Sequence, residues 1–500
     1  MAPLLLLTGL AATVMVARTL TPVEFAFYAT VISLRSLMGY LGDFGTGTAA
    51  GRMFAQLQAR RAGRQARLLF SRLLLLRAPL LALVGGVLLA FPDSISAALK
   101  LTSDERQMLP LLAAIAALEM LGPLGSYALS GTFQHADRNR VALAAGIVQP
   151  VAIVVVGLIG AGLQGVVIAV LLGSLVRTGG YLLLGLRAIK SIDRSGPPVA
   201  ELAGTYIRVA STAVVGKLAA LVHQRQILTF VGLSAFGRVD LAAFALAYDF
   251  AQQALTAVAS PVLSLLTPSL SAVSGNRAVT EQAYVFLTRL LAVAVLPLGF
   301  TLAAVMPTLV PSVFGADFVH AQLYGFIFLP AFALEIVLLS PATALMLADD
   351  KLLSTFRHVK YWTIAAAILY LPAIAWSLAA AAALMMTIRV LSAARTQQLV
   401  RRETGMSAFA GWLAPVIATT AGATVTAGLL TLWLPATLAS LAVSLGGALV
   451  AAMLVARFSG LVRERDIELA QRAMPVMVRA LRMMQRPGLR HAAHDDRDLG

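Results

Sequence analysis

The sequence predicts an all-α polytopic membrane protein with about fourteen transmembrane helices. Hydrophobic residues make up 59% of the 500 residues and charged residues only 12%, whereas soluble domains carry roughly 25% charged residues. Apolar stretches of about 20 residues, the length with which a helix crosses the hydrocarbon core, recur along the whole chain. The loops between them are short, which leaves no room for a soluble catalytic domain.

The distribution of Lys and Arg predicts a topology with both ends in the cytoplasm. Loops assigned to the inside contain 26 of these residues, and loops assigned to the outside contain four. Such an excess is typical of cytoplasmic loops. The predicted spans are 2–17, 25–44, 68–91, 108–133, 141–161, 163–186, 206–231, 240–267, 286–308, 321–346, 361–377, 379–394, 409–433 and 436–457.

Net charge and residue usage exclude several classes of function. A net charge of +16 would indicate nucleic acid in a soluble protein, but here it is explained by flanking charges that orient the helices. A chain without cysteine has no disulfide, thiolate metal site or cysteine nucleophile. The six histidines show no ligand spacing. We therefore predict no catalytic residue, metal, cofactor or nucleic-acid partner.

The chain is predicted to consist of two halves and two further helices. The Pro-containing segment 193–200 is the best candidate for a hinge. The segments 20–26 and 231–237, which lead into the second and eighth spans at an offset of 211, share only Phe25 and Phe236. This is a weak internal similarity of the kind expected from the repeats common in transporters. The predicted divisions are 1–190 (helices 1–6), 191–200 (linker), 201–395 (helices 7–12), 396–457 (helices 13 and 14) and 458–500 (a basic cytoplasmic tail, with an amphipathic helix expected at 463–486).

Charged residues inside the predicted spans indicate function, because a charge at membrane depth is costly and by default faces protein or water. Arg35 lies ten residues into the second span and Lys217 eleven residues into the seventh, so both are near the midplane. When the residues near the cytoplasmic face are set aside, six cations and three anions remain. The residues set aside are Asp43, Arg72, Arg208 and Arg289.

We expect the surplus cations to line one water-accessible cavity that attracts an anionic group. Arginine suits phosphate because its planar fork donates two parallel hydrogen bonds. The predicted substrate-binding residues are Arg18, Arg35, Arg77, Arg177, Lys217, Arg225 and Arg389. For any one of them, a static ion pair that holds helices together is the alternative. Glu119, Asp249 and Glu335 are either the partners in such pairs or the carriers of a coupling ion.

Several motifs resemble those of polysaccharide-transport-type, O-antigen-like oligosaccharide flippases of the multidrug/oligosaccharidyl-lipid/polysaccharide exporter superfamily. The first lies at the start of the second span, and a similar outer turn precedes the tenth. Thr21 and Ala26 stand where glycines are commoner in the family. The motif residues are Ala17, Arg18, Leu20, Pro22, Glu24, Phe25, Ala26 and Tyr28, then Gly42, Asp43, Phe44 and Gly45, and in the second half Phe314 to Phe318 with Ala321.

The resemblance covers roughly residues 1–395 and implies two six-helix lobes around a central cavity that opens alternately to each side. It implies a polyprenyl-pyrophosphate-linked oligosaccharide as cargo, the bacterial inner membrane as location, and membrane lipids and a glycan polymerase or export machinery as partners. Arg225 stands where many members carry an aspartate. Ion coupling through that aspartate therefore does not transfer to this chain.

Other classes fit the sequence less well. A multidrug or small-molecule antiporter of the same superfamily is the alternative, but it would need a cavity dominated by carboxylates. A glycosyltransferase or polymerase would need a large outer loop, and the longest outer loop is 92–107. The glycine-rich segment 45–51 follows a membrane helix rather than a strand, so it is not expected to bind nucleotides.

Replacing Lys217 or Arg35 with Ala should reduce glycan export more than replacing Arg208, because only the first two are expected near the midplane. Export is measured as surface polysaccharide in strains that carry each variant. Equal export by all three variants would count against a cationic cavity.

Overall fold

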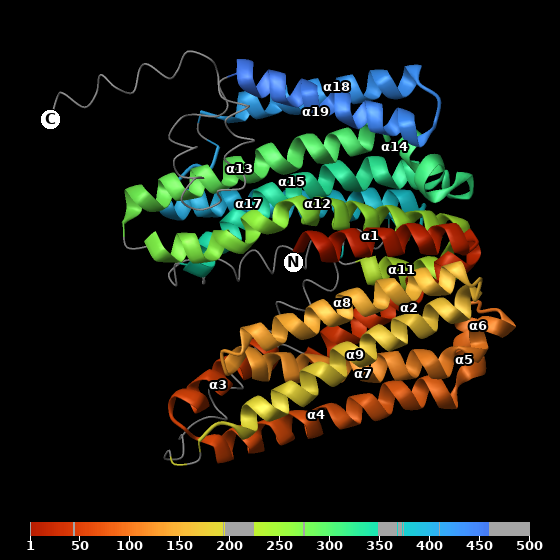
Figure 1. The fold of residues 1–500 in the computed structure, drawn as a ribbon, viewed down its shortest axis with the longest axis vertical. Coiled ribbons are helices and arrows are strands. Elements are labelled where there is room, and N and C mark those ends of the chain that lie inside the picture. The colour runs from red at the N-terminus through yellow and green to blue at the C-terminus, as the bar shows by residue number, and fades with distance from the viewer. Residues whose placement is uncertain are drawn as a thin grey trace. The chain divides into compact units, whose positions relative to one another are not determined.

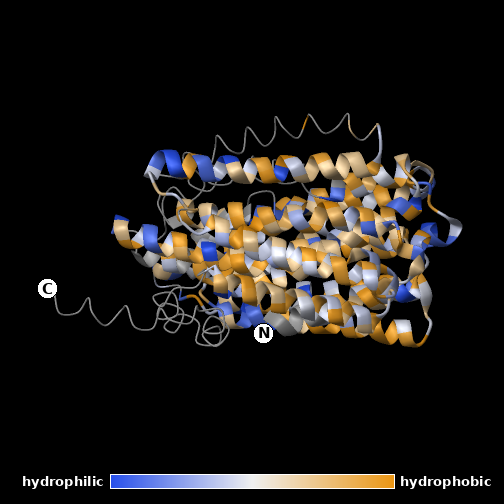
Figure 2. Cartoon of the chain, turned by 90° about the horizontal axis from the view of Figure 1, so that it is seen from above, coloured by the Kyte–Doolittle hydropathy of each residue, from blue (hydrophilic) through white to orange (hydrophobic). Residues whose placement is uncertain are grey.

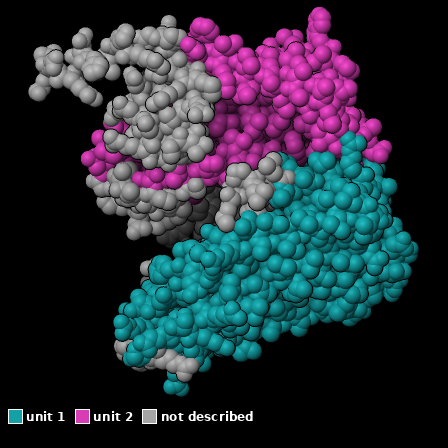
Figure 3. All heavy atoms as spheres, viewed as in Figure 1, with its two compact units in different colours: residues 1–246, 363–382 teal, residues 247–362, 383–500 magenta. Residues whose placement is uncertain are grey.

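The computed structural model describes residues 2–43, 46–193, 195, 225–273, 276–348, 368, 373, 375–409 and 411–459. Within these ranges the chain is helical and forms no strand (Figure 1). Two compact units divide the chain (Figure 3). Unit 1 comprises Met1–Leu246 and Thr363–Ala382, and unit 2 comprises Ala247–Trp362 and Ala383–Gly500. The prediction of an all-α fold is confirmed.

Unit 1 is built from helices of the first half of the chain. Helix α7 packs along α9, α8 packs along α9, and α2 packs along α7. The helices are α1 (Ala2–Thr19), α2 (Pro22–Asp43), α3 (Thr46–Ala59), α4 (Gly63–Ala90), α5 (Pro92–Ala98), α6 (Ser103–Gln107), α7 (Leu109–Gly131), α8 (His135–Leu158), α9 (Gly162–Lys190), α11 (Arg225–Ala235) and the first residues of α12 (Arg238–Val273).

Unit 2 continues α12 and contains the later helices. Helix α13 packs against α15 and α18, and α18 packs along α19. The elements are α13 (Arg277–Ala304), α14 (Met306–Leu309), the π-helical turn η1 (Val310–Phe314), the 3-10 turn η2 (Ala316–Phe318), α15 (Ala321–Ala348), α17 (Leu378–Thr404, whose first residues belong to unit 1), α18 (Leu413–Trp433) and α19 (Leu438–Phe458).

Every predicted span except the seventh and the eleventh falls on a described helix. By length and composition, nine helices of the described residues can cross a membrane. Apolar side chains such as Leu75 and Leu158 are 69% and 75% exposed, as expected of residues that face lipid. Hydrophilic residues gather toward the helix ends (Figure 2). The chain is a multi-pass membrane protein.

Two predicted loops differ from the structure. The segment 45–67 contains α3, whose buried Ala50, Met53, Phe54 and Leu57 follow the spacing of one helical face. Because of its basic residues, this segment was predicted as a loop. Helix α17 likewise continues to Thr404, through most of the loop predicted at 395–408. The predicted linker and tail lie mostly outside the described residues, so the predicted divisions stay predictions.

Glycines allow α2, α7 and α9 to approach closely. A Cβ atom added at Gly42 would overlap the backbone of Met120, and one added at Gly125 would overlap the carbonyl oxygen of Tyr181. Small residues at such crossings let membrane helices pack backbone to backbone. This close approach fixes the relative positions of the side chains on the three helices.

Polar contacts also hold the connection between α4 and α7 to α11 and to the start of α12 within unit 1. The guanidinium of Arg238 donates from two nitrogens to the carboxylate of Glu105, at 2.6 and 2.9 Å, and also to the carbonyl of Lys100. Lys100 has a positive φ of 51° and donates from Nζ to the carbonyl of Ser234 at 2.6 Å. Glu105 also completes the capping box of α6 with Thr102.

We expect Gly125→Ala to lower the free energy of unfolding by about 1–3 kcal/mol, because the new methyl group overpacks the contact between α7 and α9. The matched control is Gly179→Ala on α9, where no atom lies within 4 Å of an added Cβ and the change favours the helix. Thermal unfolding of the detergent-purified protein measures both. Equal losses in the two variants would contradict close packing at Gly125.

Candidate functional site

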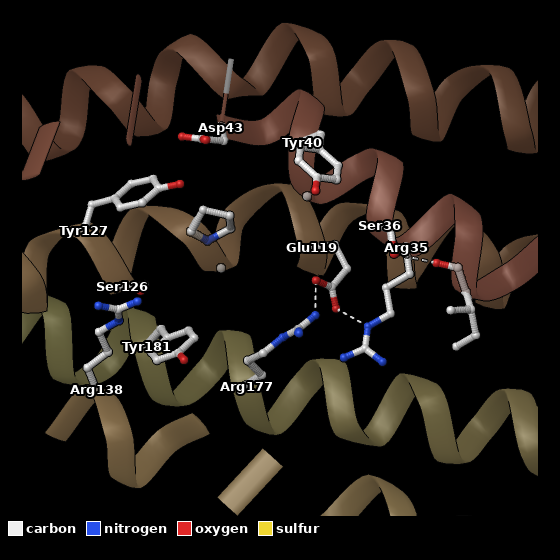
Figure 4. A pocket seen from close by; sticks show the side chains of 14 residues that line it. Arg35, Ser36, Tyr40, Asp43, Glu119, Ser126, Tyr127, Arg138, Arg177 and Tyr181 are labelled. Carbon is white, nitrogen blue, oxygen red and sulfur yellow. Dashed lines mark hydrogen bonds and ion pairs between the residues drawn. The ribbon is translucent and has the colours of Figure 1, made fainter. Parts of the chain in front are cut away.

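A polar pocket of about 630 Å³ lies within unit 1, among α2, α7, α8 and α9. Its volume falls in the range usual for small-molecule sites. Figure 4 shows Arg35 toward one end of the pocket and Arg138 toward the other. The lining residues that carry the argument are Arg35, Asp43, Glu119, Arg138, Arg177 and Tyr181.

One carboxylate and two guanidinium groups form the deep part of this pocket. Nε of Arg35 donates to Oε1 of Glu119 at 3.0 Å, and Nη2 of Arg177 donates to Oε2 of the same carboxylate. Ser174 Oγ also donates to Oε1 at 2.7 Å, and Nη1 of Arg35 donates to Gln149 Oε1 at 2.6 Å. The carboxylate of Glu119 therefore accepts hydrogen bonds from residues of both α2 and α9.

Exposure decreases from Arg177 to Glu119. The side chain of Arg177 is 32% exposed, that of Arg35 is 14% exposed, and that of Glu119 is 7% exposed. Each residue lies well inside its helix, where an unpaired charge would be costly. The ion pairs stabilise charges at this depth, and Arg177 is the member with most access to the pocket.

The pocket carries an excess of positive charge. Three lining residues are cations, namely Arg35, Arg138 and Arg177, and two are acidic, namely Asp43 and Glu119. Asp43 accepts a hydrogen bond from the amide of Gly47 at 2.7 Å, at the start of α3. At ordinary ionisation the lining therefore has one positive charge in excess. Low-dielectric walls strengthen its attraction for an anion.

The two ends of the pocket differ in exposure. Arg138 is exposed in the first turn of α8, in the loop predicted to be cytoplasmic, whereas Arg35 is in the middle of α2. Tyr127 and Tyr181 lie along the wall between them (Figure 4). A ligand that enters past Arg138 would thus meet aromatic rings and hydroxyl groups before the buried arginines.

Unit 2 contains a second buried ion pair. Nε of Arg389 on α17 donates to both carboxylate oxygens of Glu335 on α15, at 2.9 and 3.1 Å, and Nη1 donates to Tyr248 Oη at 3.0 Å. The guanidinium lies 5.0 Å from the ring centroid of Phe332, a cation–π distance. Arg389 is 17% and Glu335 is 12% exposed.

The other predicted site residues occupy varied positions. Arg77 is buried and donates to the carbonyls of Gly42 and Leu73, and Arg225 is buried and donates to the carbonyl of Ala245 at 3.4 Å. Arg18 is exposed near the end of α1, and Asp249 is half-buried on α12. Lys217 lies outside the described residues. Of the seven predicted cations, the pocket brings together Arg35 and Arg177, and the cavity predicted between the lobes stays a prediction.

Sequence reasoning missed several residues of these two sites. Arg138 was counted only as a charge that sets the topology, and Gln149, Ser174 and Tyr248 carry no charge. A census of all strongly polar residues within the spans would have found Gln149, which stands in an apolar stretch. No group of three or more His, Asp or Glu side chains that could hold a metal ion occurs in the described part of the chain.

The fold is that of membrane transporters. It is similar to the solved structure of the lipid II flippase MurJ in an inward closed conformation, with a TM-score of 0.64 and 12% identity over 91% of this chain and 97% of that one. It is also similar to an inward-facing multidrug resistance MATE family transporter of the MOP superfamily, with a TM-score of 0.60 and 15% identity over 80% of this chain and 94% of that one. At such identities the likeness shows the fold alone.

The sequence comparisons define the family. The sequence model of the family described as polysaccharide biosynthesis protein matches residues 15–323, so the chain belongs to this family. No curated protein matches the sequence. The predicted resemblance to polysaccharide-transport-type exporters is thereby confirmed, as is the predicted fold class of about fourteen transmembrane helices.

Glu335→Gln and Arg389→Gln should each lower the free energy of unfolding by about 3–5 kcal/mol, because each leaves its former partner as a buried, unpaired charge. The double variant should recover most of that loss, since both charges are then absent. Thermal unfolding in detergent measures the four proteins. If the losses of the two single variants simply add in the double variant, the pair is not energetically coupled.

Proposed function

We propose that this protein translocates a polyprenyl-pyrophosphate-linked oligosaccharide across the bacterial inner membrane during surface polysaccharide biosynthesis, by alternating access. The observation that carries the proposal is the positively charged polar pocket among the helices of unit 1. Membership of the polysaccharide biosynthesis family and a fold shared with a lipid II flippase support the same assignment.

The chemistry of the pocket suits a diphosphate. Arginine donates in a planar fork that matches two phosphate oxygens, and hydrogen bonds between charged groups are the stronger ones. Arg138 at the exposed end attracts the headgroup, and Arg177 and Arg35 receive it further in. Tyr181 and Tyr127 offer aromatic faces with polar tips to an attached sugar.

The remaining predicted residues keep roles in this proposal. Lys217 and Arg225, with Arg18, Arg77 and Arg389, are candidates for contacts with the headgroup at other stages of transport. Asp249 is a candidate for proton or sodium coupling, together with the paired carboxylates Glu119 and Glu335. Membrane lipids and a glycan polymerase or export machinery are the proposed partners.

A multidrug or small-molecule antiporter is the alternative assignment, and its cationic substrates would be repelled by the excess positive charge of the pocket. A deletion strain separates the two. Flipping predicts loss of a surface polysaccharide and accumulation of its lipid-linked unit on the inside. Unchanged surface glycan with altered drug sensitivity would overturn the proposal.

Arg177→Ala and Arg138→Ala should each reduce flipping at least about tenfold, the equivalent of about 1.4 kcal/mol, because each removes the excess positive charge from the pocket. The matched control is Arg140→Ala. Arg140 lies on the same helix as Arg138, is exposed, and pairs with Asp137 away from the pocket lining.

Flipping is measured in proteoliposomes as the protection of a fluorescent polyprenyl-diphosphate oligosaccharide from a membrane-impermeant quencher. Reductions of the same size in all three variants would show that general surface charge, rather than the pocket, governs transport.

A further inference from the structure

The glutamates of the two ion pairs lie in the same short sequence. The tripeptide Ala-Leu-Glu occurs at 117–119 in α7 and at 333–335 in α15, an offset of 216, and Ala-Leu recurs at the same offset at 128–129 and 344–345. Each glutamate pairs with an arginine of a later helix, Arg177 on α9 or Arg389 on α17. These arginines are offset by 212 residues. Both halves of the chain thus contain a pair of this kind.

The third partner differs between the two pairs. In unit 1, Glu119 is shared by Arg177 and Arg35, so two cations meet one anion. In unit 2, Arg389 pairs with Glu335 and also donates to the neutral hydroxyl of Tyr248. Arg177 lines the pocket and is 32% exposed, whereas Arg389 is 17% exposed and lies against Phe332 and Tyr248.

The bonds of Glu119 are arranged so that one partner can leave. Oε1 accepts from Arg35 and Ser174, and Oε2 accepts from Arg177. If Arg177 turns to another anion, Glu119 still holds an arginine and a hydroxyl group and does not become an isolated charge. For Glu335, the described residues supply one cation, Arg389.

We infer that Glu119 is an exchangeable counter-ion that occupies Arg177 until a diphosphate displaces it. This inference rests on the proposed function, since it assumes an anionic substrate. In the empty pocket, Glu119 keeps two nearby cations from repelling each other. On entry of the substrate, Arg177 exchanges a carboxylate for phosphate oxygens, which suit the same donor geometry.

The test compares the affinity of inorganic pyrophosphate for the detergent-purified full-length protein and its variants by isothermal titration calorimetry. Glu119→Gln should bind at least about tenfold more tightly than the wild type, since release of one charge-assisted contact of about 1.4 kcal/mol corresponds to a factor of ten. The double variant Glu119→Gln with Arg177→Ala should lose this gain.

The control adds the same unit of positive charge outside the pocket lining. Asp137→Asn removes a partly exposed carboxylate of α8 that does not line the pocket. This variant should bind pyrophosphate within about twofold of the wild type. If Glu119→Gln is too unstable to titrate, Glu119→Asp, whose shorter side chain cannot bridge both arginines, should show an intermediate gain.

The outcomes separate the two proposals. Unchanged or weaker binding by Glu119→Gln, or an equal gain in Asp137→Asn, overturns the exchange, while wild-type flipping in proteoliposomes leaves the proposed function intact. Absence of flipping by the wild type, with no pyrophosphate binding by any variant, overturns both. A gain confined to Glu119→Gln that requires Arg177 supports the exchange.

Discussion

The arrangement of unit 1 depends on one carboxylate shared by two guanidinium groups in the middle of the membrane-spanning helices. Glu119 on α7 joins Arg35 on α2 to Arg177 on α9, and each of these charges would be costly at this depth without the others. The glycine contacts at Gly42 and Gly125 bring the three helices close enough for these bonds. The close packing of the backbones and the ion pairs therefore support each other. The lining of the pocket beside them contains one more cation than carboxylates.

Much of the fold follows from the sequence, because apolar runs of membrane-spanning length can form little other than helices in lipid. Helix α3 was missed, since basic residues that set the topology are interleaved with its buried face. For the site, the cost of a buried charge was sufficient to select Arg35, Arg177 and Glu119. Ion pairing with a glutamate was the stated alternative for each arginine, but which arginine meets which glutamate was not predictable, because it depends on which helices meet and at what height. Gln149 and Ser174 complete the site without any charge that would mark them.

In each unit, an arginine from a later helix pairs with a glutamate from an earlier one. In unit 1 a second arginine, Arg35, shares the glutamate. The charge census of the sequence, six cations against three anions, is thus partly explained within unit 1, where one anion serves two cations. In unit 2, an aromatic ring and a phenol hydroxyl lie beside the guanidinium of Arg389.

The carboxylate of Glu105 has two roles. It completes the capping box of α6, and it accepts hydrogen bonds from Arg238 at the start of α12. The contacts of Glu105 therefore link α6, a helix of five residues, to the start of α12, a helix of 36 residues. Withdrawal of Arg238 would also remove a hydrogen bond from the carbonyl of Lys100, whose left-handed backbone follows the end of α5. Movement of the long helix at this end would therefore break its contacts with both Glu105 and Lys100 in the connection between α4 and α7.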